Sequence, residues 1–528
     1  MAPASIWIRS RPWIVKLVET LPFLALLALF NVSGLRGVDY GFHRDEIDWQ
    51  IEPVHQMLKT GILLPGSYIY PSLCKWLIML PAAAHGAQAA VDSAGSPVAV
   101  QAAMVAEMDS GQPYLLAARA LFIVISSLTL VWVYGAALAV RHRWWEALLA
   151  AASLGLSWEY CYHSRWLATD CVLVQFAALT VFMLALFRRT NRALWLYGAA
   201  LAAGLGTGTK YTGVFLLVPV LLAGALSLPL RKVRAQALRA TLLCLLAFGV
   251  YLLTTPATVL DPFRFVTETR SISTYYMHTH GGYTARSALR HMAIVLSYFS
   301  FAYFSPFPLL SVALFCVMLG GGALWLLRDV RFGATVAGFP FVFLMFFCIR
   351  YRVVMVRNYL FVVPFLSLLV ARGFADLMHW LPRRWLRWGV AGAMAAAFLI
   401  QGEWIAAAGE SIRDVGDDAF VAQALDYVAR RPTESFRVSG LVRSMALKLH
   451  RSLPANVVAD NAGGHVVFFP RSEGPGPWQW KTNDPWLTEQ VFGPKEVNFN
   501  WYASWAGHDR VVVMTLEKAR STGVPLAK

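Results

Sequence analysis

Charged residues are scarce in this sequence of 528 residues: they make up 14% of it, whereas hydrophobic residues make up 57%. With a mean hydropathy of +0.52, this composition is that of an integral membrane protein. Acidic residues are fewer than basic ones, 30 Asp and Glu against 46 Lys and Arg, and the net charge is +16. The bases stand in short runs between apolar segments, as in the loops of a polytopic protein, so the charge does not indicate nucleic-acid binding.

Cysteine is also rare, and its positions argue against an exterior stapled by disulfides. All six cysteines lie in or beside apolar segments, although Cys161 and Cys171 could approach one another. The first apolar segment, which begins near Leu21, lacks a small-residue cleavage site after it. We therefore expect a retained span rather than a removed signal peptide.

Apolar runs of roughly 17–25 residues are long enough to cross a bilayer, and they predict about eleven transmembrane helices. The loops between them carry basic runs on alternate sides, which by the positive-inside bias predicts a cytoplasmic N-terminus and a C-terminal region outside. The expected spans are 17–35, 115–140, 146–163, 170–187, 194–209, 212–230, 240–256, 294–327, 333–349, 358–373 and 387–406.

The loop at 36–113 is predicted to lie outside as well. Its stretch from Glu46 to Thr60 has polar and apolar residues at helical spacing and is expected to form an amphipathic helix on the membrane surface. A second piece, from Tyr68 to Leu80, is too short for a span and is interpreted as a surface or re-entrant helix.

Beyond about residue 406 the long apolar runs stop and charge density rises. Short β-type runs alternate with helical stretches there, which predicts a small α/β domain on the outer side. The sequence thus divides into a transmembrane domain at 1–405 and an extracytoplasmic domain at 406–528. The β-type runs begin at Phe436, Asn456, His465 and Arg510, and the helical stretches are 417–430 and 441–450.

Asp45 and Glu46 directly follow the first apolar span. Two adjacent carboxylates at a membrane surface indicate catalysis, with a helix cap or a surface salt bridge as the structural alternative. Several basic residues fall on loops predicted to lie outside, against the insertion bias, and would suit a lipid phosphate or pyrophosphate. Contact with anionic headgroups or pairing with local carboxylates is the alternative. These basic residues are Arg165, Lys210, Arg264, Arg270, Arg286, Arg290, Arg350, Arg352 and Arg357.

Five motifs now stand in order along the chain. They are Asp45-Glu46, Tyr70-Pro-Ser-Leu, His163-Ser-Arg-Trp-Leu-Ala-Thr-Asp170, Gly206-Thr-Gly-Thr-Lys-Tyr-Thr-Gly213 and Arg357-Asn-Tyr-Leu-Phe-Val-Val-Pro364. In these motifs the sequence resembles, over about residues 15–375, the polytopic glycosyltransferases of the GT-C class. The most similar group contains the dolichyl-phosphate-mannose protein mannosyltransferases and the bacterial aminoarabinose transferase of lipid A.

The resemblance implies an inverting transferase that takes a sugar from a polyprenyl-phosphate carrier and passes it to a lipid, protein or glycan acceptor. It implies a bacterial inner membrane, with the site facing the periplasm. Asp45 matches the general base, and Glu46 would orient the loop or assist; the physical logic of displacement at an anomeric carbon agrees. The donor phosphate and sugar would be bound by Tyr70, Arg165, Asp170, Lys210, Tyr211, Arg350, Arg352 and Arg357.

A divalent cation is a candidate cofactor, because Asp170 matches a family carboxylate that faces the same cavity as Asp45; pairing of Asp170 with Arg165 alone is the alternative. Lys210 lies in a turn of small residues that would let the backbone approach a phosphate, or else it snorkels to the interface.

One residue departs from the aminoarabinose transferase pattern, because Tyr70 stands where that pattern has a base. Phosphate binding cannot be copied onto this position, and Lys75 or Arg165 would have to compensate. The departure also weakens lipid A as the acceptor.

The loop at 256–293, rich in aromatic residues, histidine and glycine, is a candidate mobile lid. Its His278 and His280 have no third zinc ligand in view. Tryptophans of the outer domain are candidates for stacking on sugar rings, with ordinary packing as the alternative. They are Trp478, Trp480, Trp486, Trp501 and Trp505.

Two other classes of function fit part of the pattern. A transporter or flippase of a lipid-linked sugar would also have many spans and outward arginines, but it would be expected to show related halves or matched broken helices, and none are seen. A non-catalytic glycan-assembly protein would keep the tryptophans and have no need of Asp45. The transferase interpretation accounts for both features.

Overall fold

The structure is a computed structural model, and it describes most of the chain. The described residues are 12–39, 44–93, 95–141, 143–229, 231–278, 284–413, 417–448, 451–458, 464–468, 490–492 and 511–521.

Within these residues, seven helices are long and apolar enough to cross a membrane. They belong to α7 (Gln112–Arg141), α10 (Thr169–Thr190), α13 (Val233–Thr254), α17 (Pro308–Arg328), α18 (Val330–Arg350), η4 (Val356–Val362) with α19 (Val363–Trp380), and α20 (Arg384–Arg413). Further apolar helices are α2 (Pro12–Leu35), α11 (Ala193–Thr209), and η2 (Tyr211–Leu216) with α12 (Leu217–Leu226). A helical membrane fold is thereby confirmed.

Two of the expected spans are broken, so their prediction as single helices was wrong. The run at 146–163 forms α8 (Trp144–Gly155) and α9 (Trp158–His163), and the run at 294–327 forms α16 (Ala288–Tyr298), η3 (Phe299–Tyr303) and α17. Pro306 and Pro308 explain the second break, because proline has no amide to donate and is favoured at the start of a new helix.

The two breaks face one another, which satisfies the backbone groups that they free. The Ser157 hydroxyl donates to the Tyr303 carbonyl at 2.9 Å. The Gln401 amide donates to the Leu156 carbonyl and, at 3.0 Å, to the Phe304 carbonyl. Irregular backbone within a membrane bundle requires such partners, because lipid offers none.

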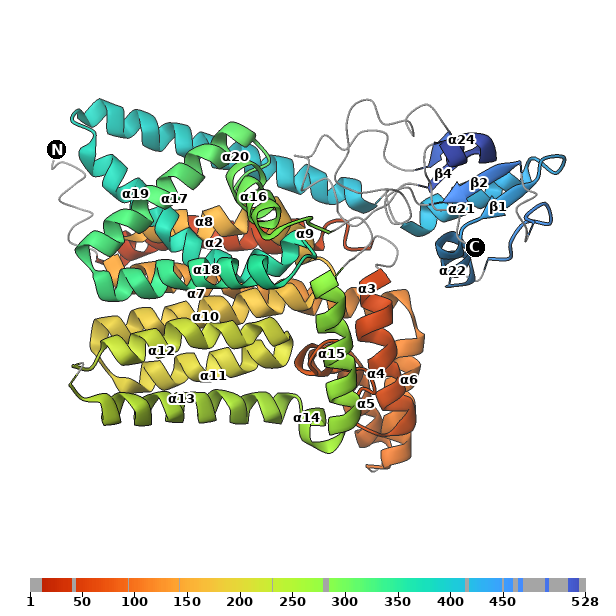
Figure 1. Ribbon diagram of the computed structural model, residues 1–528, viewed down its shortest axis with the longest axis horizontal. Coiled ribbons are helices and arrows are strands. Elements are labelled where there is room, and N and C mark those ends of the chain that lie inside the picture. Colours follow the sequence, from red (N-terminus) through yellow and green to blue (C-terminus); the bar gives the residue numbers. More distant parts are fainter. Residues whose placement is uncertain are drawn as a thin grey trace.

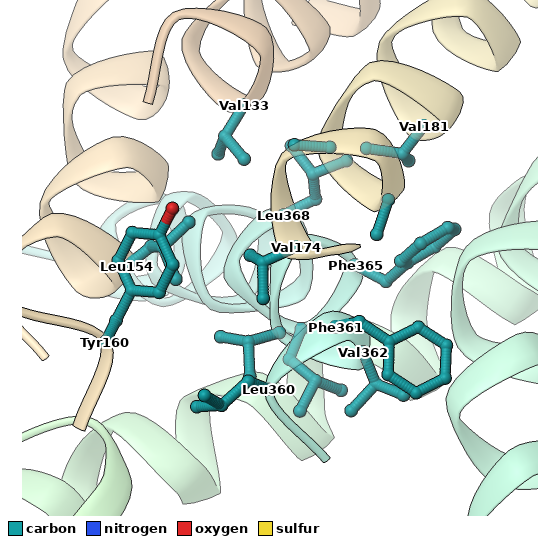
Figure 2. Packing of buried hydrophobic residues seen from close by; sticks show 14 of the residues in the cluster. Val133, Leu154, Tyr160, Val174, Val181, Leu360, Phe361, Val362, Phe365 and Leu368 are labelled. Carbon is teal, nitrogen blue, oxygen red and sulfur yellow. The ribbon is translucent and has the colours of Figure 1, made fainter. Parts of the chain in front are cut away.

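The centre of the bundle is η4 with α19, which is buried on nearly all sides. Within its apolar stretch of 18 residues, 94% is buried inside the protein. Figure 2 shows side chains of this segment packed against α7, α8, α9 and α10. A helix that is apolar all round can occupy such a position. The packed residues labelled there are Leu360, Phe361, Val362, Phe365 and Leu368 with Val133, Leu154, Tyr160, Val174 and Val181.

A layer of helices lies across one end of the bundle (Figure 1). It consists of α3 (Arg44–Glu46), η1 (Ile47–Ile51), α4 (Glu52–Thr60), α5 (Leu73–Asp92), α6 (Pro97–Asp109), α14 (Ala257–Leu260) and α15 (Pro262–His278). The expected helix from Glu46 to Thr60 is present, and the piece after Tyr68 becomes α5. Helix α6, which pairs with α5, was not predicted.

The C-terminal part contains a four-stranded sheet in the order β1-β2-β4-β3. β1 runs parallel to β2, and the other pairs are antiparallel. The predicted run at Asn456 forms only an isolated bridge from Val457 to Phe436, and β3 was not predicted. The elements are α21 (Asp417–Ala429), β1 (Phe436–Val438), α22 (Gly440–Lys448), β2 (His465–Phe468), β3 (Gln490–Phe492), β4 (Val511–Thr515) and α24 (Leu516–Ser521).

Helices α17 and α19 approach closely at a pair of glycines. A Cβ added to Gly321 would lie 2.2 Å from the Leu369 carbonyl oxygen and 2.5 Å from the Gly373 nitrogen. Helix contact in membranes depends on such small residues, because apolar side chains gain little by leaving lipid. Gly320, next to Gly321, would meet no atom within 4 Å.

We expect Gly321→Ala to destabilise the bundle by about 1–3 kcal/mol, the usual cost of overpacking. Gly320→Ala is the matched control and should be neutral or stabilising by up to about 1 kcal/mol, since alanine favours helix. Thermal unfolding of both variants in detergent micelles measures the difference. Equal melting temperatures would show that the α17 and α19 backbones can separate at no cost.

Candidate active site

Asp45 and Arg357, which are 312 positions apart in the chain, form an ion pair at the end of the bundle. The Arg357 Nη1 donates to Asp45 Oδ2 at 2.7 Å. Asp45 has a side chain 30% exposed and Arg357 one 16% exposed. The carboxylate is thus held by the protein and still open to a small molecule.

A second ion pair adjoins the first. The Lys210 ammonium donates to Asp170 Oδ1 at 2.6 Å and to Asn358 Oδ1 at 2.7 Å. The Nε of Arg357 lies 4.0 Å from Asp170 Oδ2, so this guanidinium stands between the two carboxylates. Asp45, Asp170, Lys210 and Arg357 are called the charged quartet below.

Local backbone structure explains the position of each member. Asp170 lies in the first turn of α10, where the helix dipole favours a negative charge. Lys210 is the extended residue that ends α11, and Arg357 lies in η4, next to Asn358. The quartet is therefore built where the helix ends meet.

Trp166 supports the guanidinium of Arg357, whose Cζ lies 5.5 Å from the centre of the indole ring, within reach of a cation–π interaction. The indole Nε1 donates to His163 Nδ1 at 3.1 Å. His163 Nε2 then carries the proton and faces Glu159 Oε1 at 3.2 Å. This buried chain of hydrogen bonds fixes the surface on which Arg357 rests.

Glu46 faces away from Asp45's ion pair and is fully buried. Its carboxylate accepts from Arg119 Nε at 3.0 Å and Nη2 at 2.5 Å, and from the Leu167 amide at 2.9 Å. Arg119 also donates to the Val38 carbonyl at 2.8 Å. Glu46 therefore joins the loop of Asp45 to α7 and to the segment before α10.

Tyr70 adjoins the quartet, with its ring centre 6.0 Å from the Lys210 ammonium. Burial raises the pKa of its hydroxyl well above the usual value, so the group stays protonated. The Tyr70 and Ser67 carbonyls accept from the Lys75 ammonium at 2.8 and 3.1 Å. Burial lowers the pKa of Lys75 to about 8.

Helix α15 covers the segment before Tyr70. Glu268 accepts from the Tyr68 amide at 2.5 Å, and Asp261 accepts from the Tyr68 hydroxyl at 2.9 Å. Tyr211 donates to the Tyr68 carbonyl at 2.7 Å. The Tyr211 side chain thus supports the site through the backbone of Tyr68. The expected lid region contains an ordered helix at this place, while His280 lies outside the described residues.

The Arg165 side chain does not lie where it was expected, beside the donor phosphate. Its guanidinium is fully buried and donates to the Ser33 carbonyl at 2.7 Å and to the Arg36 carbonyl at 3.3 Å. These carbonyls belong to the end of α2, where a helix leaves acceptors without partners. Nor does Arg165 pair with Asp170, whose partner is Lys210.

The glycines around Lys210 pack against protein. A Cβ on Gly213 would lie 2.3 Å from the Gly206 carbonyl oxygen, and one on Gly208 would lie 2.0 Å from the Thr254 hydroxyl oxygen. The small residues thus let the chain approach itself. Lys210 is buried and does not snorkel to the interface.

Arg350 and Arg352, which were also expected near the phosphate, form no ion pair with the four described members of the quartet. Arg350 ends α18 and Arg352 lies just beyond it, and the Arg352 amide donates to the Tyr276 carbonyl at 3.0 Å. The five tryptophans expected to stack on sugars all lie outside the described residues.

A divalent ion fits this arrangement poorly. Asp45 and Asp170 are each paired with a cation, and no cluster of three His, Cys, Asp or Glu residues suited to a metal occurs in the part of the chain that the structure describes. The six cysteines are free thiols.

Sequence reasoning assigned no role to four residues of this region: Arg119, Glu159, Trp166 and Asn358. Arg119 and Glu159 each gave a usable signal, because an ionisable residue inside an apolar span needs a partner. Trp166 and Asn358 lay in the quoted motifs, but spacing alone does not show which residues face a charge.

Comparison with known proteins bears on the fold. Residues 104–258 match the model of the family described as dolichyl-phosphate-mannose-protein mannosyltransferase. The apo structure of ArnT from Cupriavidus metallidurans superposes with a TM-score of 0.50 at 15% identity, covering 96% of this chain and 98% of that one. The chain has the GT-C glycosyltransferase fold.

Two further solved structures align with the chain at lower scores. ArnT from Cupriavidus metallidurans bound to undecaprenyl phosphate has a TM-score of 0.47, 14% identity, and coverage of 95% and 98%. The apo oligosaccharyltransferase of Archaeoglobus fulgidus has a TM-score of 0.45, 12% identity, and coverage of 85% and 70%. No curated protein matches the sequence significantly.

We expect Arg119→Met to destabilise the protein by about 3–5 kcal/mol, because it leaves the Glu46 carboxylate buried without its cation. Arg192→Met removes an exposed arginine and is the control, with an expected effect within about 0.5 kcal/mol. Unfolding in detergent, followed by circular dichroism, measures both. A small effect of Arg119→Met would show that the Glu46 contacts do not hold the loop.

Proposed function

We propose that this GT-C protein is an inverting glycosyltransferase that moves a sugar from a polyprenyl-phosphate carrier to an acceptor hydroxyl. The observation that carries the proposal is the charged quartet, in which a partly exposed carboxylate adjoins one half-buried and one buried cation. The matched family, named for dolichyl-phosphate-mannose, supports a lipid-phosphate donor.

In this proposal Asp45 is the general base. Displacement at an anomeric carbon is accelerated when a carboxylate takes the proton of the attacking hydroxyl. Asp45 is the more exposed member of its ion pair, so an acceptor could reach it, whereas Glu46 is fully buried.

Arg357 and Lys210 would stabilise the leaving phosphate. A guanidinium and an ammonium in a site of low dielectric offset developing charge strongly, and a guanidinium suits phosphate oxygens. Donor phosphate would compete with Asp45 for Arg357, which would free the carboxylate to act as a base only when donor is present. Asp170 would hold Lys210 in place.

The site is proposed to face the periplasm of a bacterial inner membrane. The supporting observation is that the opposite helix ends carry the basic loops that mark a cytoplasmic side. There Arg188, in the last turn of α10, pairs with Asp329 between α17 and α18 at 2.6 Å, and Arg328 pairs with Asp376 at 2.8 Å.

A pair of single cysteines tests this orientation in a cysteine-free background. Val91→Cys on α5 should react with a membrane-impermeant maleimide added to intact cells, whereas Ala235→Cys on α13 should react only after permeabilisation, since both side chains are exposed at opposite ends. Labelling of Ala235→Cys in intact cells would reverse the proposed orientation.

We expect Asp45→Asn to lower turnover at least about a hundredfold, the usual scale for a lost general base, with donor binding largely kept. Glu46→Gln should do less to turnover and act through loop order. Both variants are assayed with saturating undecaprenyl-phosphate-linked sugars, and donor binding is measured separately.

Asp92→Asn, at an exposed position of α5, serves as the control and should leave turnover unchanged. A larger loss in Glu46→Gln at unchanged folding would exchange the two roles. Full activity in both variants would remove catalysis from this loop.

A further inference from the structure

Arg357 has to change its partner in the proposed reaction. Its guanidinium donates to Asp45 at 2.7 Å and lies 4.0 Å from Asp170, and a donor phosphate would draw it away from the first of these carboxylates. The Trp166 indole, whose ring centre lies 5.5 Å from the guanidinium carbon, carries no charge. It attracts the cation without competing for it as an anion would, so this contact can persist while the ionic partner is exchanged.

Two further buried side chains support the indole. Glu159 and His163 are four positions apart on α9, so they lie on the same face of this helix. The indole Nε1 donates to His163 Nδ1 at 3.1 Å, and His163 Nε2 lies 3.2 Å from Glu159 Oε1. All three side chains are buried, with Trp166 3% exposed, Glu159 6% and His163 8%.

Glu159 selects the tautomer of His163 that the indole requires. An indole N–H can only donate, so the imidazole nitrogen that faces it has to accept, and the proton of the neutral ring is then on Nε2. If that proton moved to Nδ1, two N–H groups would face one another across the contact with Trp166, and the indole would have to shift. By accepting from Nε2, the Glu159 carboxylate excludes this arrangement.

The carboxylate also strengthens each contact that follows. A ring that donates to an anion at one nitrogen is a better acceptor at the other, because consecutive hydrogen bonds polarise one another. An indole that donates strongly carries more electron density on its face, where the cation of Arg357 lies. The negative charge of Glu159 thus acts on the guanidinium through neutral groups.

Glu159 has no cation to explain its burial. Its partner is the imidazole of His163, and no lysine or arginine pairs with it among the residues that the structure describes. By contrast Glu146, which is also buried, pairs with Arg143 at 3.4 Å. A carboxylate buried against a neutral group is costly, and an ionisable residue in an apolar run indicates a functional role.

We propose that Glu159 and His163 are positioning residues that hold the Trp166 indole against the guanidinium while it exchanges its carboxylate partner for the donor phosphate. The proposal rests on the proposed transferase function, in which Arg357 serves the donor phosphate. Neither residue touches a substrate, because both act through the indole. Their replacement should therefore weaken donor binding.

Binding of undecaprenyl phosphate, measured by native mass spectrometry in micelles of a neutral detergent, tests the proposal. Glu159→Met removes the acceptor for Nε2 and should weaken this lipid at least about tenfold, the scale of a lost charged hydrogen bond. Glu159→Gln keeps an oxygen that can accept and should bind within about threefold of the unchanged protein. A residue that only filled space would be replaced as well by methionine as by glutamine, so equal binding by the two variants would overturn the proposal.

A double-mutant cycle shows whether the effect passes through Arg357. Arg357→Met alone should weaken undecaprenyl phosphate at least about tenfold. Adding Glu159→Met to it should cause no further loss, because residues that act as a unit are not additive. Additive losses would show that Glu159 acts at another place and would contradict the positioning role.

Trp166→Phe gives a second test, which does not depend on whether Glu159→Met folds. It keeps a ring beside Arg357 but cannot donate to His163. We expect it to weaken undecaprenyl phosphate at least about threefold, the scale of a cation–π contact at a half-buried site. Unchanged binding would remove the indole from the donor site and overturn the proposal.

Glu146→Met is the matched control, because this buried glutamate lies in the first turn of α8, at the opposite end of the same apolar run. It should leave undecaprenyl phosphate binding unchanged. An equal loss would show a general effect of replacing a buried carboxylate and would overturn the proposal.

The positioning claim and the transferase claim fail differently. Loss of undecaprenyl phosphate in Arg357→Met but not in Glu159→Met removes the positioning role and leaves the transferase function standing. Unchanged binding in Arg357→Met removes the donor site on which both claims rest. Loss in both variants, with transfer that needs Asp45, supports both.

Discussion

The Glu46–Arg119 pair is the contact on which the geometry of the site depends. It joins the short helix α3 to α7, and through the Leu167 amide to the segment that leads into α10. Adjacent residues of a helix point about 100° apart, so fixing Glu46 inward turns Asp45 outward to Arg357. A buried ion pair is weak evidence for stability, but it specifies one arrangement when every lone pair is matched. Here the hydrogen-bonded Glu46 carboxylate holds its partly exposed neighbour, Asp45, in position.

The same reasoning explains how much of the fold could be predicted. Long apolar runs fix helices such as α10 and α18 to within a few residues, because length and hydropathy alone decide a span. Hydropathy does not detect a break whose carbonyls are satisfied from outside the helix. Gln401, in a helix far along the chain, donates to carbonyls at both breaks. The local sequence before Ser157 gives no indication that such a hydrogen-bond donor is available. Strand β3 is short, and its sequence has no alternation of polar and apolar residues from which a strand could be predicted.

For the candidate site, sequence reasoning predicted which residues lie close together where charge and position together limit the choices. Asp45, Asp170, Lys210 and Arg357 were all expected near one another, and the structure places them in contact. Sequence reasoning did not place Arg165, because the positive-inside rule counts a basic residue in a loop without showing which way its side chain points. The free carbonyls of α2 compete for that guanidinium as effectively as a phosphate would, and only the folded chain shows which acceptor is nearer.

Two groups of arginines at the same end therefore differ in what surrounds them. Arg357 lies between two carboxylates and over an indole, so its position is set before any ligand arrives, and the cost of ordering it is met during folding. Arg286, Arg290 and Arg350 have no such partners among the residues that the structure describes, and they are exposed. Matched charges give precise geometry but little long-range attraction, whereas unmatched charges attract an anion from a distance without fixing it closely. Both kinds of arginine lie in adjacent segments, because the Arg352 amide donates to the Tyr276 carbonyl and the Tyr276 hydroxyl donates to the sulfur of Met355, two residues before Arg357.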